Sequence, residues 1–185
     1  MAGLPDRRPR RRGGGGSLTA RRIVLLRHGR TDWNGTHRFQ GHTDVPLDAV
    51  GLEQAHRAAA LLAPLAPARV VSSDLARAVG TAEPLARRLG LDLATDPALR
   101  ETHAGRWEGC FDSDLAADPD YQAWRMGADV PAGGSETRSQ VADRATPALL
   151  SWAEDLDPSA VLVAVTHGGT VRCVIGRLLD LPVDR

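Results

Sequence analysis

Residues 160–165 read AVLVAV, and an uninterrupted apolar run of this length is typical of a fully buried β-strand. Residues 23–27 (IVLLR) form a second run of this kind, and residues 69–73 (RVVSS) and 91–94 (LDLA) are weaker candidates. Strands that lack a polar face belong to sheets that are covered on both sides. The four runs therefore predict a largely parallel sheet between two layers of helices.

Helical patterns alternate with these strands, at residues 51–62, 75–89, 137–156 and 169–179. Leu52, Ala55 and Ala59 have the spacing of one buried helical face, and Asp74 stands where an N-cap would begin the second helix. The alternation predicts an α/β fold, a three-layer α/β/α sandwich with a mostly parallel central sheet. Residues 105–136 contain prolines, a glycine pair and tryptophans, and we expect them to form a small inserted lid.

Length and composition exclude several classes of protein. A chain of 185 residues is about one domain, and 42% hydrophobic residues supply a core. No apolar run approaches the roughly 18–20 residues that a membrane span needs. Cys110 and Cys173 are too few for a disulfide framework, and 23 basic residues balance 23 acidic ones. We expect a cytoplasmic protein that binds neither nucleic acid nor a membrane.

The N-terminal residues 1–20 differ in composition from the rest of the chain. They contain five arginines within the first dozen residues, followed by four consecutive glycines, with no apolar periodicity. No apolar core follows the basic cluster, as a secretory signal would require. We therefore expect a disordered Arg/Gly-rich tail at 1–20 and one domain at 21–185.

The residues suited to chemistry follow the predicted strands directly. Ligands of parallel α/β sheets bind beyond the carboxyl ends of the strands. Arg27 and His28 follow the first strand, Arg77 the second, Glu101 the third, and His167 the strand at 160–165. These five side chains should converge at one edge of the sheet.

This set of side chains fits phosphoryl transfer. Arginine binds phosphate oxygens through a planar fork of donors, and a histidine with an unprotonated ring nitrogen is a nucleophile. Arg27 and Arg77 should disfavour the charged form of His28 by like-charge repulsion. Glu101 can give a proton to a leaving alkoxide and later take one from water. Because no ligand-spaced pair such as HxxxH occurs among the histidines, we expect neither a metal site nor another cofactor.

Five ordered blocks of sequence resemble the histidine phosphatase superfamily, also called the phosphoglycerate mutase-like family. These blocks are RHGRTDWN at 27–34 followed by RFQG at 38–41, SSDLARA at 72–78, LRE at 99–101, GRWEG at 105–109 and VTHGG at 165–169. The resemblance spans about residues 21–181. It also points, on fewer residues, to the actinobacterial phosphatases that act on glucosyl-3-phosphoglycerate.

The resemblance implies a phosphoglycerate mutase-like fold and a role for each matching residue. His28 would become phosphohistidine, Arg27, Arg77 and His167 would hold the phosphoryl group, and Glu101 would be the proton donor and acceptor. Asn34 would form a hydrogen bond nearby, although it could also only cap a turn. Gln40, Gly41 and Gly168 would line the substrate pocket. The implied protein is a metal-independent phosphomonoester hydrolase acting on a small phosphorylated metabolite of the phosphoglycerate or sugar-phosphate type. The sequence leaves the oligomeric state open, with a homodimer as one candidate.

Departures from the family pattern leave two alternatives open. A phosphoglycerate mutase carries a longer insertion between the glutamate and the second histidine than this chain has between Glu101 and His167, which favours hydrolysis. A non-catalytic phosphate-binding remnant is the other alternative, because relatives usually continue into another strand after the last helix. We therefore expect the C-terminal end of the domain to be incomplete and one sheet edge to be unpaired. Arg106, Arg125 and Arg138 are candidates for binding a second anionic group of the substrate.

Overall fold

A computed structural model describes residues 22–181, so the predicted tail at 1–20 lies outside the described residues. Within them, four strands form one parallel sheet in the order β1-β4-β2-β3. The strands are β1 (Arg22–Arg27), β2 (Arg69–Ser72), β3 (Leu93–Thr95) and β4 (Val161–Thr166). The apolar run at residues 160–165 corresponds to β4, and all six residues of β4 are buried. The predicted parallel sheet is confirmed.

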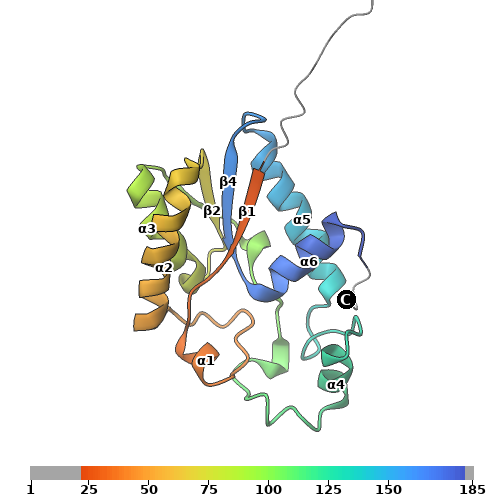
Figure 1. Ribbon diagram of the computed structural model, residues 1–185. Coiled ribbons are helices and arrows are strands. Elements are labelled where there is room, and N and C mark those ends of the chain that lie inside the picture. Colours follow the sequence, from red (N-terminus) through yellow and green to blue (C-terminus); the bar gives the residue numbers. More distant parts are fainter. Residues whose placement is uncertain (1–21, 182–185) are drawn as a thin grey trace, which may run out of the picture.

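Helices cover both faces of the sheet (Figure 1). Val163 and Val165 of β4 pack with α2 (Ala49–Leu62) and α3 (Ala76–Leu89), whereas Leu162 and Ala164 pack with α5 (Arg138–Glu154) and α6 (Gly168–Leu178). Successive side chains of a strand point to opposite faces, so a strand between two helical layers must be apolar throughout. This explains the AVLVAV run and confirms the three-layer α/β/α architecture.

Two local expectations about the helices are wrong. The side chain of Leu52 is 50% exposed, and Gly51 is the buried residue at the start of the inward face of α2, together with Ala55 and Ala59. Asp74 does not cap α3, whose N-cap is Leu75 without a side-chain hydrogen bond. Instead, the carboxylate of Asp74 accepts from the guanidinium of Arg100 at 2.7 and 2.5 Å. Ion pairing with a distant arginine has replaced the local cap.

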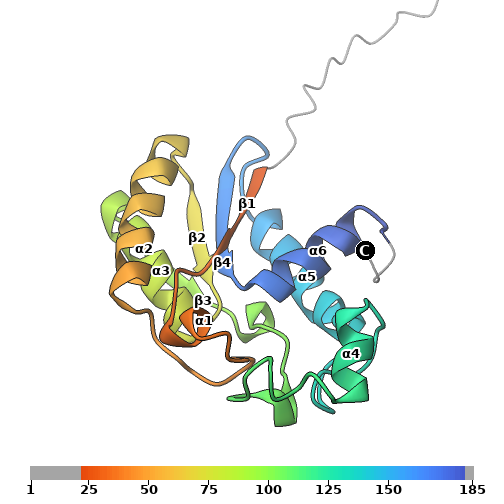
Figure 2. The ribbon, with the colours of Figure 1, turned by 60° about the horizontal axis from the view of Figure 1, so that its bottom comes forward.

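The segment predicted to form a lid, residues 105–136, contributes most of a small, partly aromatic core. It contains the 3-10 turn η3 (Gly105–Trp107) and α4 (Pro119–Arg125), and its core includes Trp107 and Tyr121. Figure 2 shows α4 and α1 (Asp32–Gly35) at the same end of the molecule, which is the carboxyl end of the strands. Two further 3-10 turns complete the described elements, η1 (Ala63–Leu65) and η2 (Pro97–Leu99).

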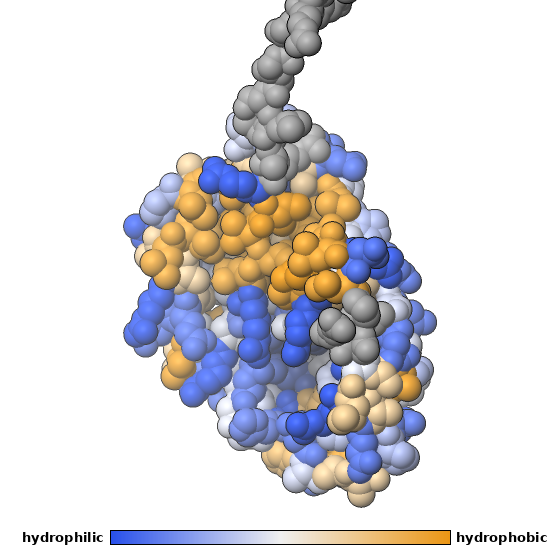
Figure 3. Space-filling model, turned by 45° about the vertical axis from the view of Figure 1, so that its right-hand side comes forward, coloured by the Kyte–Doolittle hydropathy of each residue, from blue (hydrophilic) through white to orange (hydrophobic). Residues whose placement is uncertain are grey.

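Strand β1 lies at an edge of the sheet. Within residues 22–181 it pairs only with β4, so its other side has no strand partner there. Figure 3 shows apolar side chains gathered on the side of the molecule that carries β1 and α6. Exposed apolar residues of α6 and its C-terminal end include Ile175, Leu178 and Leu179. None of the helices between residues 22 and 181 is long and apolar enough to span a bilayer.

Candidate active site

The register of the sheet brings the two histidines together. Arg27 of β1 pairs with Thr166 of β4, so His28 and His167 are the next residues on adjacent strands. The backbone N–H of His28 donates to the carbonyl of Thr166 at 2.9 Å, and the two imidazole centroids lie 5.1 Å apart. Parallel pairing alone therefore joins residues that are 139 positions apart (167 minus 28).

A cavity of about 640 Å³ opens at this edge. Its wall includes eight of the nine predicted site residues: Arg27, His28, Asn34, Gln40, Gly41, Arg77, Glu101 and Gly168. His167 is the exception, because its side chain is fully buried and does not line the cavity. The polar residues selected from the sequence thus surround one space.

His28 is held in one tautomer. Its Nδ1 lies 2.7 Å from the carbonyl oxygen of Gly29. A carbonyl oxygen can only accept, so Nδ1 carries the proton and Nε2 keeps its lone pair. Burial lowers the pKa of His28 from 6.5 to about 4, and the charges of Arg77 and Arg27 act in the same direction. The sequence predicted that the two arginines keep His28 uncharged, whereas burial is the larger cause of its lowered pKa.

His167 is deeper than His28. Its Nε2 lies 2.9 Å from the hydroxyl of Ser73, the residue that follows β2. Burial lowers the pKa of His167 well below its usual value, with Arg77 contributing in the same direction, so its ring is neutral. Its Nδ1 is buried without a hydrogen-bond partner within the described residues.

Arg77 is a buried cation beside both histidines. Two of its guanidinium nitrogens donate to the carbonyls of Thr43 and Gly41 at 2.9 and 2.8 Å, which fixes the plane of the fork. Its Nε is buried without a partner in this part of the chain. Arg27 contributes a second, more exposed cation to the cavity wall. A dianionic ligand at this place would neutralise both charges.

Glu101 lies against the N-terminus of α6. Its carboxylate accepts from the backbone N–H groups of Gly169 at 3.1 Å and Thr170 at 3.2 Å, and from that of Thr102 at 2.9 Å. The close approach depends on Gly169, since a Cβ atom there would lie 2.3 Å from a carboxylate oxygen of Glu101. Helix N-terminal amides are natural partners of a carboxylate.

Arg144 positions the segment that carries Glu101, and sequence analysis missed it. Its guanidinium donates to the carbonyls of Ala98, Arg100 and Glu101 at 2.8–2.9 Å, and it forms an ion pair with Glu136 at 2.6 Å. His42 also lies 2.8 Å from the Glu101 carbonyl. No sequence motif distinguishes Arg144 from other helical arginines, because the three carbonyls that it binds are more than 40 residues away in the sequence.

The predicted binding residues line the cavity in different ways. Asn34 accepts from the backbone N–H of Thr31 and completes a capping box at the start of α1, and it also lies in the cavity wall, so its binding role stays a prediction. Oε1 of Gln40 lies 3.0 Å from the hydroxyl of Thr31, within hydrogen-bonding distance. Gly41 has a φ of +53°, and a Cβ atom there would lie 2.2 Å from an oxygen of Glu108. The carboxylate of Glu108 accepts from the backbone of His42 and Thr43, which fixes this loop.

The three arginines expected to bind a second anion do not face the main cavity. Arg106 pairs with Asp118 and Asp120. Arg125 and Arg138 line a separate, neighbouring cavity of about 400 Å³. That cavity shares four wall residues with the main one: Thr102, Trp124, Gly169 and Arg172. Arg172 is the only arginine among these four residues, and no sequence pattern distinguishes it from other helical arginines.

The described residues include no group of three His, Cys, Asp or Glu side chains placed to hold a metal ion. His42 and His103 instead stack at 4.7 Å, and His103 lies 2.5 Å from the hydroxyl of Ser135. Metal independence stays a prediction, to be tested with a chelator.

A neutral histidine with a free Nε2, two arginines and a carboxylate at the ends of parallel strands define a phosphoryl-transfer site. The model of the histidine phosphatase superfamily (branch 1) matches residues 23–185, so the chain belongs to this superfamily.

Known relatives include phosphatases and a mutase. The chain is 42% identical to the glucosyl-3-phosphoglycerate phosphatase of Mycolicibacterium vanbaalenii, over 90% of this chain and 78% of that protein. It is 35% identical to the probable phosphoglycerate mutase GpmB of Yersinia pestis, over 86% of this chain and 75% of that protein. The structure of the mycobacterial glucosyl-3-phosphoglycerate phosphatase in complex with VO3 matches with a TM-score of 0.84 and 40% identity, over 89% of this chain and 85% of that one. The predicted family and phosphoglycerate mutase-like fold are confirmed, and the protein is a phosphatase of the histidine type.

Proposed function

We propose that the protein hydrolyses a phosphorylated sugar-glycerate, of the glucosyl-3-phosphoglycerate type, through a phosphohistidine at His28. The observation that carries the mechanism is the tautomer of His28, whose Nδ1 is occupied by the Gly29 carbonyl and whose Nε2 is free in the cavity wall. The substrate class rests on the relatives that are 42% identical to this chain. The segment between Glu101 and His167 is shorter than the one expected in a phosphoglycerate mutase, and this difference favours hydrolysis over the mutase reaction.

In the first step, Nε2 of His28 attacks phosphorus and the bond from phosphorus to the leaving oxygen breaks. Glu101 gives that oxygen its proton. The phosphoryl oxygens are held by Arg27 and Arg77, with His167 beside them. The unpartnered Nε of Arg77 and Nδ1 of His167 support this role, because buried polar atoms are normally paired and an oxyanion would pair them.

In the second step, water attacks phosphorus and the phosphorus–nitrogen bond breaks. Glu101 takes the proton of the water, and inorganic phosphate leaves with His28 restored. The same arginines serve both transition states, because charge develops on the same phosphoryl oxygens each time. Asn34, Gln40, Gly41 and Gly168 lie in the same cavity wall and would contact the substrate.

The test is hydrolysis of p-nitrophenyl phosphate in excess EDTA, by the wild type and by the His28→Ala variant. We expect the wild type to turn over, the variant to be inactive, and mass spectrometry of the quenched wild type to show a phosphoryl adduct on His28. Loss of wild-type activity in EDTA would contradict metal independence. Phosphate affinity without turnover would identify the binding remnant.

Incubation with 3-phosphoglycerate separates hydrolysis from the mutase reaction. We expect inorganic phosphate to be released and no 2-phosphoglycerate to accumulate. The cytoplasmic location and the homodimer stay predictions, which fractionation and light scattering can test.

A further inference from the structure

The neighbouring cavity continues the main one past Glu101. Thr102 and Gly169, which line both cavities, are also the residues whose backbone N–H groups bind the Glu101 carboxylate. If Glu101 protonates the leaving oxygen, as the proposed function requires, that oxygen lies at this junction. The group attached to the oxygen then extends from the main cavity into the neighbouring one.

Four arginines line the neighbouring cavity, and three of them are already engaged. Arg177 forms an ion pair with Asp143 at 2.6 Å. Arg138 donates to the carbonyls of Ala128 and Trp124 and lies 4.4 Å over the ring of Trp124. Arg125 lies 5.8 Å over the ring of Tyr121. These contacts hold the three side chains against the lid or α5.

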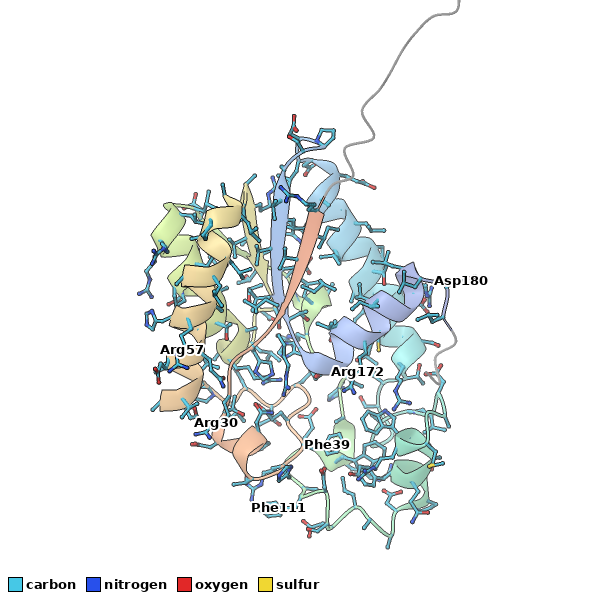
Figure 4. All side chains as sticks on the ribbon, in the orientation of Figure 1. Arg30, Phe39, Arg57, Phe111, Arg172 and Asp180 are labelled. Atoms are coloured by element: carbon cyan, nitrogen blue, oxygen red, sulfur yellow. The ribbon has the colours of Figure 1, made fainter. Side chains whose placement is uncertain are left out.

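Arg172 is different. Its Nε donates at 3.3 Å to the carbonyl of Gly168 in its own helix, and no carboxylate in the part of the chain that the structure describes forms an ion pair with it. Burial raises the pKa of the adjacent Cys173 thiol to about 11, so no thiolate balances this charge. Figure 4 shows Arg172 at the end of α6 nearest the lid. Arg125 and Arg138 also form no ion pair within the described residues, but Arg172 alone of the four arginines lines both cavities. Arg172 is therefore the cation without a carboxylate partner that lies at the junction of the two cavities.

The positive charge of Arg172 also acts on the neighbouring Arg138. Burial lowers the pKa of Arg138, and Arg172 acts in the same direction. Two cations therefore lie beside one cavity, and this arrangement favours an anionic ligand.

We propose that Arg172 binds a carboxylate carried by the leaving group of the substrate, and that the neighbouring cavity holds the rest of that leaving group. Arg172 is then a specificity-determining residue. It replaces Arg106, Arg125 and Arg138 as the candidate for binding the second anion. This inference rests on the proposed function, which places the leaving oxygen at Glu101.

The experiment compares two substrates that differ in one group. 3-Phosphoglycerate carries a carboxylate where glycerol 3-phosphate carries a hydroxymethyl group. The ratio of their kcat/KM values is measured for the wild type, Arg172→Gln, Arg172→Lys and Arg57→Gln. Arg57 is an exposed arginine of α2, outside both cavities, and serves as the matched control.

We expect Arg172→Gln to lower the ratio about tenfold or more, since a charge-assisted hydrogen bond to a carboxylate is lost. Arg172→Lys should restore part of the preference, and Arg57→Gln should leave the ratio at the wild-type value. An unchanged ratio in Arg172→Gln, or equal loss with both substrates, would overturn the inference.

A binding measurement separates this outcome from failure of the proposed function. The two phosphate esters are titrated calorimetrically into His28→Ala and into the His28→Ala, Arg172→Gln double variant, with cooperative melting as the check on folding. We expect the preference for 3-phosphoglycerate in binding to fall at least tenfold in the double variant. If the wild type hydrolyses neither of these esters nor p-nitrophenyl phosphate, the proposed function fails, and the binding preference alone then decides on Arg172.

Discussion

The depressed pKa of His28 should make the stability of the protein depend on pH. The unfolded chain binds a proton at His28 below pH 6.5, whereas the folded protein does so only below about 4. The contribution of His28 to the free energy of unfolding is therefore fully present above pH 6.5. It is lost as the pH falls from 6.5 to about 4, and it changes no further below that. Between about pH 7.5 and about pH 5, the two values give a loss of about 2 kcal/mol from this side chain.

Urea titrations of the wild type and of His28→Asn at the two pH values isolate this contribution. Asparagine can still donate to the Gly29 carbonyl but has no proton to gain in this range. His167, whose pKa is also lowered, contributes with the same sign in both proteins and cancels. We expect the variant to lose about 2 kcal/mol less than the wild type on going to the lower pH.

Equal losses in the two proteins would refute the reasoning, because they would show that His28 has the same proton affinity folded and unfolded. A kinetic measurement tests the pKa of His28 independently. The acid limb of kcat/KM for p-nitrophenyl phosphate, which reports groups of the free enzyme, should show no loss attributable to His28 until the pH nears 4.

Three further predictions concern residues around the nucleophile. Glu101→Gln should slow hydrolysis of glycerol 3-phosphate far more than that of p-nitrophenyl phosphate, whose leaving group needs no proton; equal losses would exclude the acid role. Gly41→Ala should cost at least about 1 kcal/mol in urea unfolding, because φ is +53° and Glu108 occupies the space of a Cβ, whereas Gly35→Ala, which has open space, should not. Arg144→Gln should lower kcat for glycerol 3-phosphate more than KM changes, since the carbonyl of Glu101 loses a donor at 2.8 Å; a change in KM alone would contradict a positioning role.

The parts of the fold that the sequence predicted are those set by local pattern. The AVLVAV run had to be an interior strand because both of its faces are covered, and parallel pairing then brought His28 beside His167. The residues at the ends of the helices depend on partners that are distant in the sequence. Asp74 looked like a helix cap, but Arg100 is a stronger partner for its carboxylate than the backbone of α3.

The chemical residues could be predicted because each follows a strand, whereas the residues that hold them could not. Arg144 and Glu108 act through carbonyl and amide groups that lie far away in the sequence, and such contacts leave no periodic signal. Arg172 was missed for a different reason. Arg172 lines both cavities and has no carboxylate partner among the described residues, and only the three-dimensional arrangement shows this.

The edge position of β1 has a consequence for how activity is lost. This strand leads directly into Arg27 and His28, and within residues 22–181 one side of it forms no ladder of hydrogen bonds. Local openings in proteins begin at such weakly held segments and cost less than global unfolding. His28 and Arg27 should therefore separate from Arg77 and His167 while the helices on both faces of the sheet are still intact. Warming should abolish turnover before circular dichroism reports melting, and the amides of β1 should exchange with deuterium sooner than those of β4.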